Sequence, residues 1–168
     1  MRFSKATPSD VTAIVRLRAA AAKKLTADFG DGHWSSITNE AAVLRDLKTS
    51  TVLVARVRRS VVGTLTLATR KPWAIDAACF TPCSRALYLI NMAVHPRQQR
   101  RGVGRALMAE ALRVARGELP ADAIRLDAYD ADAGAGEFYR RCGYRQTGTK
   151  TYRGVPLVYF ERMTGVES

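Results

Sequence analysis

Hydrophobic residues near the amino terminus recur at the spacing of an α-helix. They lie three or four positions apart, at Val11, Ile14, Leu17, Ala21 and Leu25. This spacing places their side chains on one face of a helix. Thr7 and Pro8 precede them, and Asp10 stands three residues after Thr7, as in a capping box. The pattern predicts a helix that begins close to Pro8 and ends at the glycine-containing segment 28–34.

Other segments have the pattern of β-strands. They are rich in β-branched and aromatic residues or alternate between apolar and polar positions, and they cover residues 2–6, 51–57, 61–69, 86–94, 124–130, 144–152 and 155–162. Residues 86–94 form a nearly continuous apolar run, which is typical of a strand buried on both faces. We expect the last two segments to form a hairpin that turns at Arg153 and Gly154.

Further helices complete the predicted elements. They cover residues 39–48, 102–116 and 134–143, and Gly117 suits the position just after a helix. Residues 70–85 contain two prolines and no clear period, so we expect a loop there. The order of elements, without internal repeats, predicts one α/β (α+β) domain over residues 1–168. We expect a mixed, mostly antiparallel sheet of about six to seven strands flanked by about four helices.

Length and composition agree with a folded globular chain. The sequence has 168 residues, of which 47% are hydrophobic and 25% charged, and this is enough for a substantial core. No apolar run approaches the roughly 20 residues that span a bilayer. The opening segment MRFSKATPSD lacks the apolar region of a signal peptide. We therefore expect a cytoplasmic protein without a membrane partner.

The net charge favours anionic partners. It is +12 at pH 7, and such a charge attracts nucleic acids, membrane surfaces and polyanionic small molecules alike. Aromatic residues do not interleave with the basic residues in the stacking arrays typical of nucleic-acid-binding proteins. A basic nucleic-acid-binding module is therefore kept only as an alternative.

The cysteines and histidines do not have the spacing of a metal site. Cys79 and Cys83 are four positions apart, but Cys142, His33 and His95 are distant from them and from one another. Structural zinc sites use closely spaced pairs of ligands. We therefore expect reduced thiols and no bound metal.

The segment from His95 to Leu107, HPRQQRRGVGRAL, concentrates positive charge at the start of a predicted helix. It contains four arginines and two glycines. A helix start carries unpaired backbone N–H groups and a partial positive charge, so it binds anions. Gly102 and Gly104 leave the backbone open to a ligand, and arginines bind phosphate oxygens through paired hydrogen bonds. The segment therefore predicts a phosphate-binding site.

Two common phosphate motifs do not fit this segment. The P-loop string GxxxxGK(S/T) is absent, and GVGRAL has Leu107 where the dinucleotide fingerprint requires its third glycine. Asp127 stands at the distance of the acidic residue of that fingerprint, but it lies inside the next predicted strand. The dinucleotide interpretation is therefore weak.

A third pattern fits the segment and its surroundings. QRRGVG matches Q/R-x-x-G-x-G/A, with Gln99, Gly102 and Gly104 at the key positions. Together with the preceding LINMAVHP, it resembles the coenzyme A motif of the GNAT acyl-CoA N-acyltransferases. Downstream, FYRRCGY resembles the family element L/F-Y-x-x-x-G-F/Y. The resemblance is strongest from Leu87 to Tyr144 and follows the family's order of elements over most of the chain.

The resemblance implies a GNAT fold and the transfer of an acetyl group from acetyl-CoA to a primary amine in a ternary complex, without a metal. It implies that the pyrophosphate binds the backbone at Gln99, Arg100, Arg101, Gly102, Val103, Gly104 and Arg105. It also implies that Met92, Ala93 and Val94 pair with the pantetheine arm as an added strand would. Tyr139 would be the acid that protonates the leaving thiolate.

Two positions depart from the family pattern. Many members carry a carboxylate that acts as base on the strand before the motif, but Ile90 and Asn91 stand there, and neither accepts a proton at neutral pH. Asp132 occupies the position of an asparagine that contacts coenzyme A, and an ionised aspartate cannot donate hydrogen bonds. We therefore expect a water chain that leads to another carboxylate or histidine, with Asp76 and His33 as candidates, although a plain surface role is favoured for each of them.

The acceptor is expected to be a small-molecule or peptide amine, and the sequence does not identify it. Substrate pockets of the family are built largely by the first two helices and their loop, which lies here at residues 28–36 and contains Asp31 and Trp34. Because the strand carboxylate is missing, a coenzyme-A-binding sensor without catalysis is a second alternative. The chain is also compatible with a homodimer.

Overall fold

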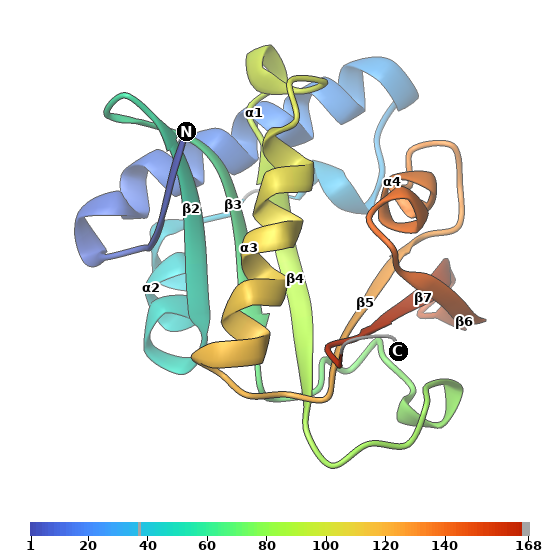
Figure 1. Ribbon diagram of the computed structural model, residues 1–168. Coiled ribbons are helices and arrows are strands. Elements are labelled where there is room, and N and C mark those ends of the chain that lie inside the picture. The colour runs from blue at the N-terminus through green and yellow to red at the C-terminus, as the bar shows by residue number, and fades with distance from the viewer. Residues whose placement is uncertain (37, 166–168) are drawn as a thin grey trace. The chain divides into compact units, whose positions relative to one another are not determined.

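The structure is a computed structural model, and it describes residues 1–36 and 38–165 (Figure 1). Its strands are β1 (Arg2–Lys5), β2 (Thr51–Val57), β3 (Ser60–Ala68), β4 (Ala86–Val94), β5 (Ala123–Tyr129), β6 (Arg145–Tyr152) and β7 (Val155–Met163). Its α-helices are α1 (Val11–Phe29), α2 (Glu40–Thr49), α3 (Val103–Gly117) and α4 (Gly136–Arg141). Short 3₁₀ helices are η1 (Pro8–Asp10), η2 (His33–Ser35), η3 (Ala77–Cys79) and η4 (Pro96–Gln98).

The strands form a seven-stranded sheet in the order β1-β2-β3-β4-β5-β7-β6. β1 pairs with β2, β2 with β3, β5 with β7 and β6 with β7 in antiparallel fashion, whereas β4 and β5 are parallel. The sheet is thus mixed and mostly antiparallel, and the described residues form four α-helices with it. The predicted fold class is confirmed.

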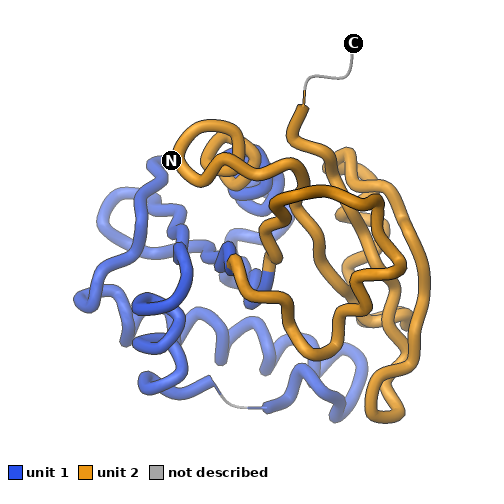
Figure 2. Tube along the Cα trace, turned by 90° about the horizontal axis from the view of Figure 1, so that it is seen from below, with its two compact units in different colours: residues 1–68, 90–110 blue, residues 69–89, 111–168 orange. Residues whose placement is uncertain are grey.

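The chain divides into two compact units, which Figure 2 shows in different colours. Unit 1 comprises residues 1–68 and 90–110, and unit 2 comprises residues 69–89 and 111–168. The chain passes from one unit to the other within β4 and again within α3. The phosphate-binding segment predicted above therefore belongs to unit 1, and Tyr139 belongs to unit 2.

In unit 1, a cluster of aliphatic residues joins β2 to the first two helices. Val52 and Val54 of β2 pack with Val11 and Ile14 of α1 and with Val43 of α2. Val52 and Val54 lie two positions apart and so share one face of the strand. This face of the sheet is therefore covered by α1 and α2.

Strand β3 approaches the first half of α3 closely at Gly63. A Cβ atom built on Gly63 would lie 2.7 Å from a methyl carbon of Leu107 and 3.0 Å from one of Val103. Only glycine leaves room for this approach. The contact holds the beginning of α3 against the sheet of unit 1, and so it positions the predicted phosphate-binding segment.

The predicted beginning of the first helix is confirmed. The backbone N–H of Thr7 donates to the carboxylate of Asp10 at 2.9 Å, and Pro8 occupies the first turn. The first turn itself is the 3₁₀ helix η1, which leads directly into α1. The second helix is also capped by its sequence, because Asn39 accepts a hydrogen bond from the N–H of Ala42 at 2.8 Å.

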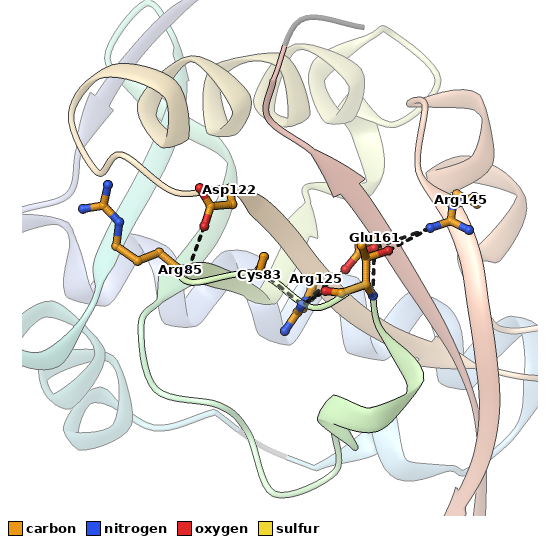
Figure 3. A network of polar contacts seen from close by, with 7 residues as sticks. Cys83, Arg85, Asp122, Arg125, Arg145 and Glu161 are labelled. Carbon is orange, nitrogen blue, oxygen red and sulfur yellow. Dashed lines mark hydrogen bonds and ion pairs between the residues drawn. The ribbon is translucent and has the colours of Figure 1, made fainter.

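In unit 2, a buried ion pair fixes the predicted loop 70–85 (Figure 3). Nε of Arg125 on β5 donates to the carboxylate of Glu161 on β7 at 3.0 Å, and the two side chains are 7% and 1% exposed. Arg125 also donates to the carbonyl of Thr81 and, at 3.3 Å, to the sulfur of Cys83. The loop is therefore tied to the middle of the sheet of unit 2.

Two local predictions are wrong in detail. Gly117 does not follow α3 but ends it, since the next N–H, of Glu118, still donates to the carbonyl of Val114 at 2.9 Å. Strand β4 is fully buried only along Leu87–Leu89. Its second half is partly buried, and Asn91 is exposed there. An apolar run in the sequence shows only that the segment is hydrophobic. How much of the strand is buried depends on the tertiary packing.

Candidate functional site

The predicted phosphate-binding segment forms a compact turn between β4 and α3. The N–H of His95 donates to the carbonyl of Val62 on β3 at 2.9 Å, so the segment starts from the sheet. Pro96 opens the short helix η4, and Nδ1 of His95 caps it by accepting from the N–H of Arg97 at 3.2 Å. The chain then turns sharply into α3.

This turn requires left-handed backbone at two positions. Arg100 has φ of 61° and Gly102 has φ of 82°, and α3 begins directly after Gly102. A glycine adopts this conformation without steric cost, so Gly102 is needed for the backbone as well as for an open surface. The N–H groups of the first turn of α3 are thereby presented at the end of a glycine-led turn, which is the geometry of an anion site.

The charged side chains of the predicted phosphate-binding segment are exposed at the surface of unit 1. Val103 is buried and anchors the helix, whereas Gln99, Arg100, Arg101 and Arg105 are exposed. The amide of Gln99 donates back to the carbonyl of Val94 at 3.2 Å, which ties the turn to the end of β4. The segment therefore combines a hydrogen-bonded turn with exposed cationic side chains, which are suited to contact phosphate oxygens.

The second half of β4 precedes this turn. Met92, Ala93 and Val94 in this half are partly buried. Asn91 has φ of 54° within the strand. A left-handed residue interrupts the regular strand and redirects the backbone that follows it.

In unit 2, Tyr139 lies on α4 in an aromatic cluster. Its ring centroid is 5.3 Å from that of Phe138, 6.2 Å from that of Tyr144 and 5.9 Å from that of Phe160. Burial raises the pKa of Tyr139 far above its usual value, and the negative charge of Asp127 adds to this effect. The phenol of Tyr139 is therefore protonated throughout the physiological range.

Asp127 is the functional candidate that the sequence analysis missed. It lies within β5 opposite Tyr159 of β7, and burial raises the pKa of its carboxyl group. A carboxylate with a raised pKa is a better proton acceptor than an exposed one. The signal was present, because aspartate is rare in buried strands and IRLDAYD places one in the middle of an otherwise strand-like segment.

The two candidate bases named from the sequence have other surroundings. Asp76 caps η3 and forms an ion pair with Lys150, and this hydrogen bond holds the pKa of the Asp76 carboxyl below its usual range. Such a carboxylate is a poor proton acceptor, so the structure speaks against Asp76 as the base. His33 is exposed in η2 of unit 1.

The remaining predicted site residues lie in surface segments. Asp132 is exposed in the segment between β5 and α4 of unit 2. Asp31 is exposed in unit 1, where the indole of Trp34 packs onto Gly32 so closely that a Cβ there would lie 2.5 Å from the ring. The contact of Asp132 with coenzyme A and a contact of Trp34 with the acceptor stay predictions.

Unit 2 also contains a cavity of about 560 Å³. Its lining includes Lys71, Arg85 and Arg125, together with residues from the segment that follows α3 and from the start of β4. None of the site residues predicted from the sequence lines this cavity. It is therefore a separate feature from the candidate site.

The described part of the chain has neither a cluster of metal ligands nor a helix that could cross a bilayer. Within it, no three His, Cys, Asp or Glu side chains are grouped as metal ligands would be, and the cysteines are free thiols. None of the helices there has the length and apolarity needed to cross a bilayer.

The sequence was compared with family models and with curated proteins. A model described as the acetyltransferase (GNAT) family matches residues 19–144. The matched region includes β4, the whole phosphate-binding segment and α4. The search of curated proteins found no match.

Solved structures share the fold over nearly the whole chain. Ribosomal-protein-alanine N-acetyltransferase from Brucella melitensis is 20% identical, with a TM-score of 0.70 over 97% of this chain and 99% of that chain. yncA from Salmonella typhimurium, whose structure contains its cofactor acetyl-CoA, is 17% identical, with a TM-score of 0.71 over 99% and 95%. Aminoglycoside 6′-acetyltransferase type Ii is 14% identical, with a TM-score of 0.72 over 100% of both chains. At these identities the likeness establishes the fold.

Proposed function

Because the chain belongs to the acetyltransferase (GNAT) family, whose members use acetyl-CoA as co-substrate, we propose that it transfers an acetyl group from acetyl-CoA to a primary amine. One observation carries this proposal: a glycine-led helix start with exposed arginines stands directly after β4, at the position of the family's coenzyme A motif. The amine attacks the thioester directly while both substrates are bound.

The residues of unit 1 fit coenzyme A. The pyrophosphate accepts hydrogen bonds from the backbone between Gln99 and Arg105, where Gly102 and Gly104 leave the N–H groups uncovered. Arg100 and Arg101 are exposed and can add charge-assisted hydrogen bonds to the phosphates. The pantetheine arm pairs with the backbone of residues 92–94, which the side chains of unit 1 cover only in part.

The residues of unit 2 supply proton transfer. An alkylamine has a pKa of about 10 and reacts only after it loses a proton, so the reaction needs a base. Asp127 takes this proton, and its raised pKa supports the assignment. The nitrogen forms a bond to the acyl carbon, the bond between that carbon and sulfur breaks, and the electron pair leaves with the sulfur.

Tyr139 assists the departure of the sulfur. A thiol has a pKa of about 8.5 and a phenol a pKa of about 10, so complete proton transfer from tyrosine to the thiolate is uphill by about 2 kcal/mol. Burial of Tyr139 increases this difference. Tyr139 therefore acts as a hydrogen-bond donor that stabilises the developing thiolate, and the phenol keeps its proton.

The carboxylate of Asp127 in β5 is an argument against the alternative that the protein is a sensor without catalysis. That alternative rested on Ile90 and Asn91, which replace the carboxylate expected on β4. Asp127 provides a carboxyl group with raised proton affinity on another strand. We therefore favour the enzyme over the sensor.

The acceptor is a primary amine whose identity stays open. Two of the three named structures are, by name, a ribosomal-protein-alanine N-acetyltransferase and an aminoglycoside 6′-acetyltransferase, so the shared fold accommodates different amines. The deciding experiment incubates the protein with acetyl-CoA and a panel of peptide amines and small amines while free thiol is measured. We expect thiol release that depends on one class of amine. Binding of acetyl-CoA without amine-dependent release from any member of a broad panel would favour the sensor.

A further inference from the structure

One residue inside a strand of unit 1 has the backbone conformation of a turn. Among the described residues other than glycine, Arg58, Asn91, Arg100 and Arg153 have positive φ. The three arginines lie in turns, whereas Asn91 lies within β4 with φ of 54°. Asparagine tolerates this conformation better than most residues, although it is a poor strand former. Asparagine at position 91 is therefore suited to the left-handed backbone found there, and not to a regular strand.

The side chain of Asn91 is held by the second helix. Its amide Nδ2 donates to Oδ2 of Asp46 on α2 at 3.1 Å. The same oxygen of Asp46 lies 3.5 Å from Nη1 of Arg18 on α1. Asn91 is exposed, and a single exposed hydrogen bond orders a side chain only weakly. The ion pair with Arg18 is what gives Asp46 a fixed position.

Arg18 is itself fixed by burial. Its side chain is 8% exposed, and Nη2 lies 3.5 Å from the hydroxyl of Thr66 on β3, which is fully buried. Nε of Arg18 is buried without a hydrogen-bond partner among the described residues. A buried guanidinium with an unpaired N–H is costly to folding. The buried guanidinium of Arg18 nevertheless forms an ion pair that fixes the carboxylate of Asp46.

These contacts form one chain of polar groups across unit 1. It runs from Thr66 of β3 through Arg18 of α1 and Asp46 of α2 to Asn91 of β4. The final link reaches the residue that directly precedes Met92, Ala93 and Val94. Those three residues are the segment whose backbone pairs with the pantetheine arm in the proposed function.

We propose that Asp46 is a positioning residue, which holds Asn91 in its left-handed conformation and so aims the backbone of residues 92–94 at the acyl end of acetyl-CoA. The inference rests on the proposed function for its catalytic consequence. Without the contact to Asp46, residue 91 relaxes toward the extended backbone of a regular strand, and the N–H groups after it turn away. Asp46 touches neither substrate in this role and acts through Asn91 alone.

The test combines Asp46→Ala with Asn91→Gly. Glycine adopts positive φ without help from a side chain. When Asn91 is replaced by glycine, the loss of Asp46 should therefore have no further effect on the backbone of residue 91. We expect Asp46→Ala to lower kcat about tenfold, in line with the cost of left-handed backbone for a residue with a Cβ. The KM for acetyl-CoA should change less than about threefold, because the phosphate-binding segment is untouched. Asn91→Ala should lower kcat at least as much as Asp46→Ala.

The double variant decides between positioning and direct contact. If Asp46 acts through Asn91, the double variant Asp46→Ala with Asn91→Gly has the kcat of Asn91→Gly and exceeds that of Asp46→Ala. If the double variant is as slow as Asp46→Ala, Asp46 acts in another way and the proposal is overturned. Asp46→Asn keeps an oxygen that accepts from Asn91, so it should retain more activity than Asp46→Ala and serves if Ala at 46 unfolds the protein.

A matched control and an independent readout complete the design. Glu40→Ala also removes a carboxylate of α2, one that is exposed and accepts from Thr12 of α1 at 2.8 Å, so kcat should not change. The three-bond coupling between the amide and α protons of residue 91 reports φ without any substrate. It should change in Asp46→Ala, and an unchanged coupling there overturns the proposal. If the wild-type protein acetylates no amine, the proposed function is wrong. The three-bond coupling of residue 91 still tests whether Asp46 controls the backbone of β4.

Discussion

Burial changes the proton affinity of two side chains in unit 2 with opposite chemical consequences. For Asp127 it raises the pKa of the carboxyl group, which makes the ionised form a stronger base. For Tyr139 it raises the pKa of the phenol, which keeps the proton in place but makes it harder to transfer. One residue is thereby suited to accept a proton and the other to donate a hydrogen bond. Pairs of this kind mark acid and base roles in active sites.

The raised pKa of Asp127 predicts a particular dependence of stability on pH. The folded protein binds this proton more tightly than the unfolded chain, so ionised Asp127 destabilises the fold at neutral pH. Asp127→Asn should therefore raise the melting temperature at pH 7. The gain should shrink as the pH falls and disappear below about pH 4, where the carboxyl group is protonated in both states. Melting curves between pH 3.5 and 8, a range set by those same pKa values, test this.

The same substitution should remove activity. Loss of a general base lowers turnover on the order of 10² to 10⁴-fold, so Asp127→Asn should be more stable and far less active than the wild type. Asp130→Asn is the matched control, because Asp130 follows the same strand but is exposed, and it should change neither property. A normal rate in Asp127→Asn would remove Asp127 from the mechanism.

The role of Tyr139 predicts a loss of turnover without a loss of binding. Tyr139→Phe keeps the ring contacts with Phe138 and Phe160 and removes only the hydroxyl. We expect turnover to fall on the order of 10²-fold, with the affinity for acetyl-CoA nearly unchanged. Tyr144→Phe is the control, since its hydroxyl is buried without a hydrogen-bond partner in the described structure and its removal should not slow the reaction. Equal rates for Tyr139→Phe and wild type, where chemistry limits, would exclude a role of the Tyr139 hydroxyl in the departure of the thiolate.

At the scale of the element, the start of α3 is where we propose that coenzyme A binds. Gly104 is the second residue of the helix, and the pyrophosphate is proposed to approach its backbone. Gly104→Glu should reduce the affinity for acetyl-CoA by more than about tenfold, because the carboxylate blocks the backbone and repels the phosphates. The fold should persist, since an acidic residue is favourable in the first turn of a helix.

A second glycine of the same helix provides the comparison. Gly117 ends α3, and a Cβ built there meets no atom within 4 Å. Gly117→Glu adds the same charge to the opposite end of the element and should leave acetyl-CoA binding intact. Titration calorimetry of both variants distinguishes a local effect on the phosphate-binding segment from a general effect of negative charge. Equal affinities for Gly104→Glu and wild type would move the coenzyme A site elsewhere.

At the scale of the whole molecule, acetyl-CoA should stabilise the fold. A ligand that binds only the folded state adds RT ln(1 + [L]/Kd), about 2.7 kcal/mol when it is present at a hundredfold excess over Kd. We expect a higher melting temperature with acetyl-CoA and little change with acetyl-pantetheine, which lacks the phosphates. The shift should weaken with added salt, because the net charge of +12 and the exposed arginines favour the anionic ligand electrostatically. No shift and no heat of binding at saturating acetyl-CoA would overturn the assignment.

The elements of this fold could be predicted from the sequence because their signals are local. The spacing of Val11, Ile14 and Leu17 gives one helix face, Thr7 and Asp10 cap its start, and the turn at Arg153 and Gly154 has positive φ in the structure. The turn and helix start at residues 95–107 could be predicted for the same reason, since the glycines and arginines there are consecutive, and phosphate binding by this segment stays a prediction. Periodicity, capping and turn chemistry act between residues only a few positions apart.

The tertiary structure decided what depends on residues far apart in the chain. The sequence contains Asp127, but its raised proton affinity follows from burial by other segments of unit 2. Likewise, Arg18, Asp46 and Asn91 stand on three elements, and no spacing in the sequence relates them. β7 lies between β5 and β6, so the last strand separates two that precede it. Burial and charge pairing are properties of packing, and packing brings together groups whose separation along the chain carries no periodic signal.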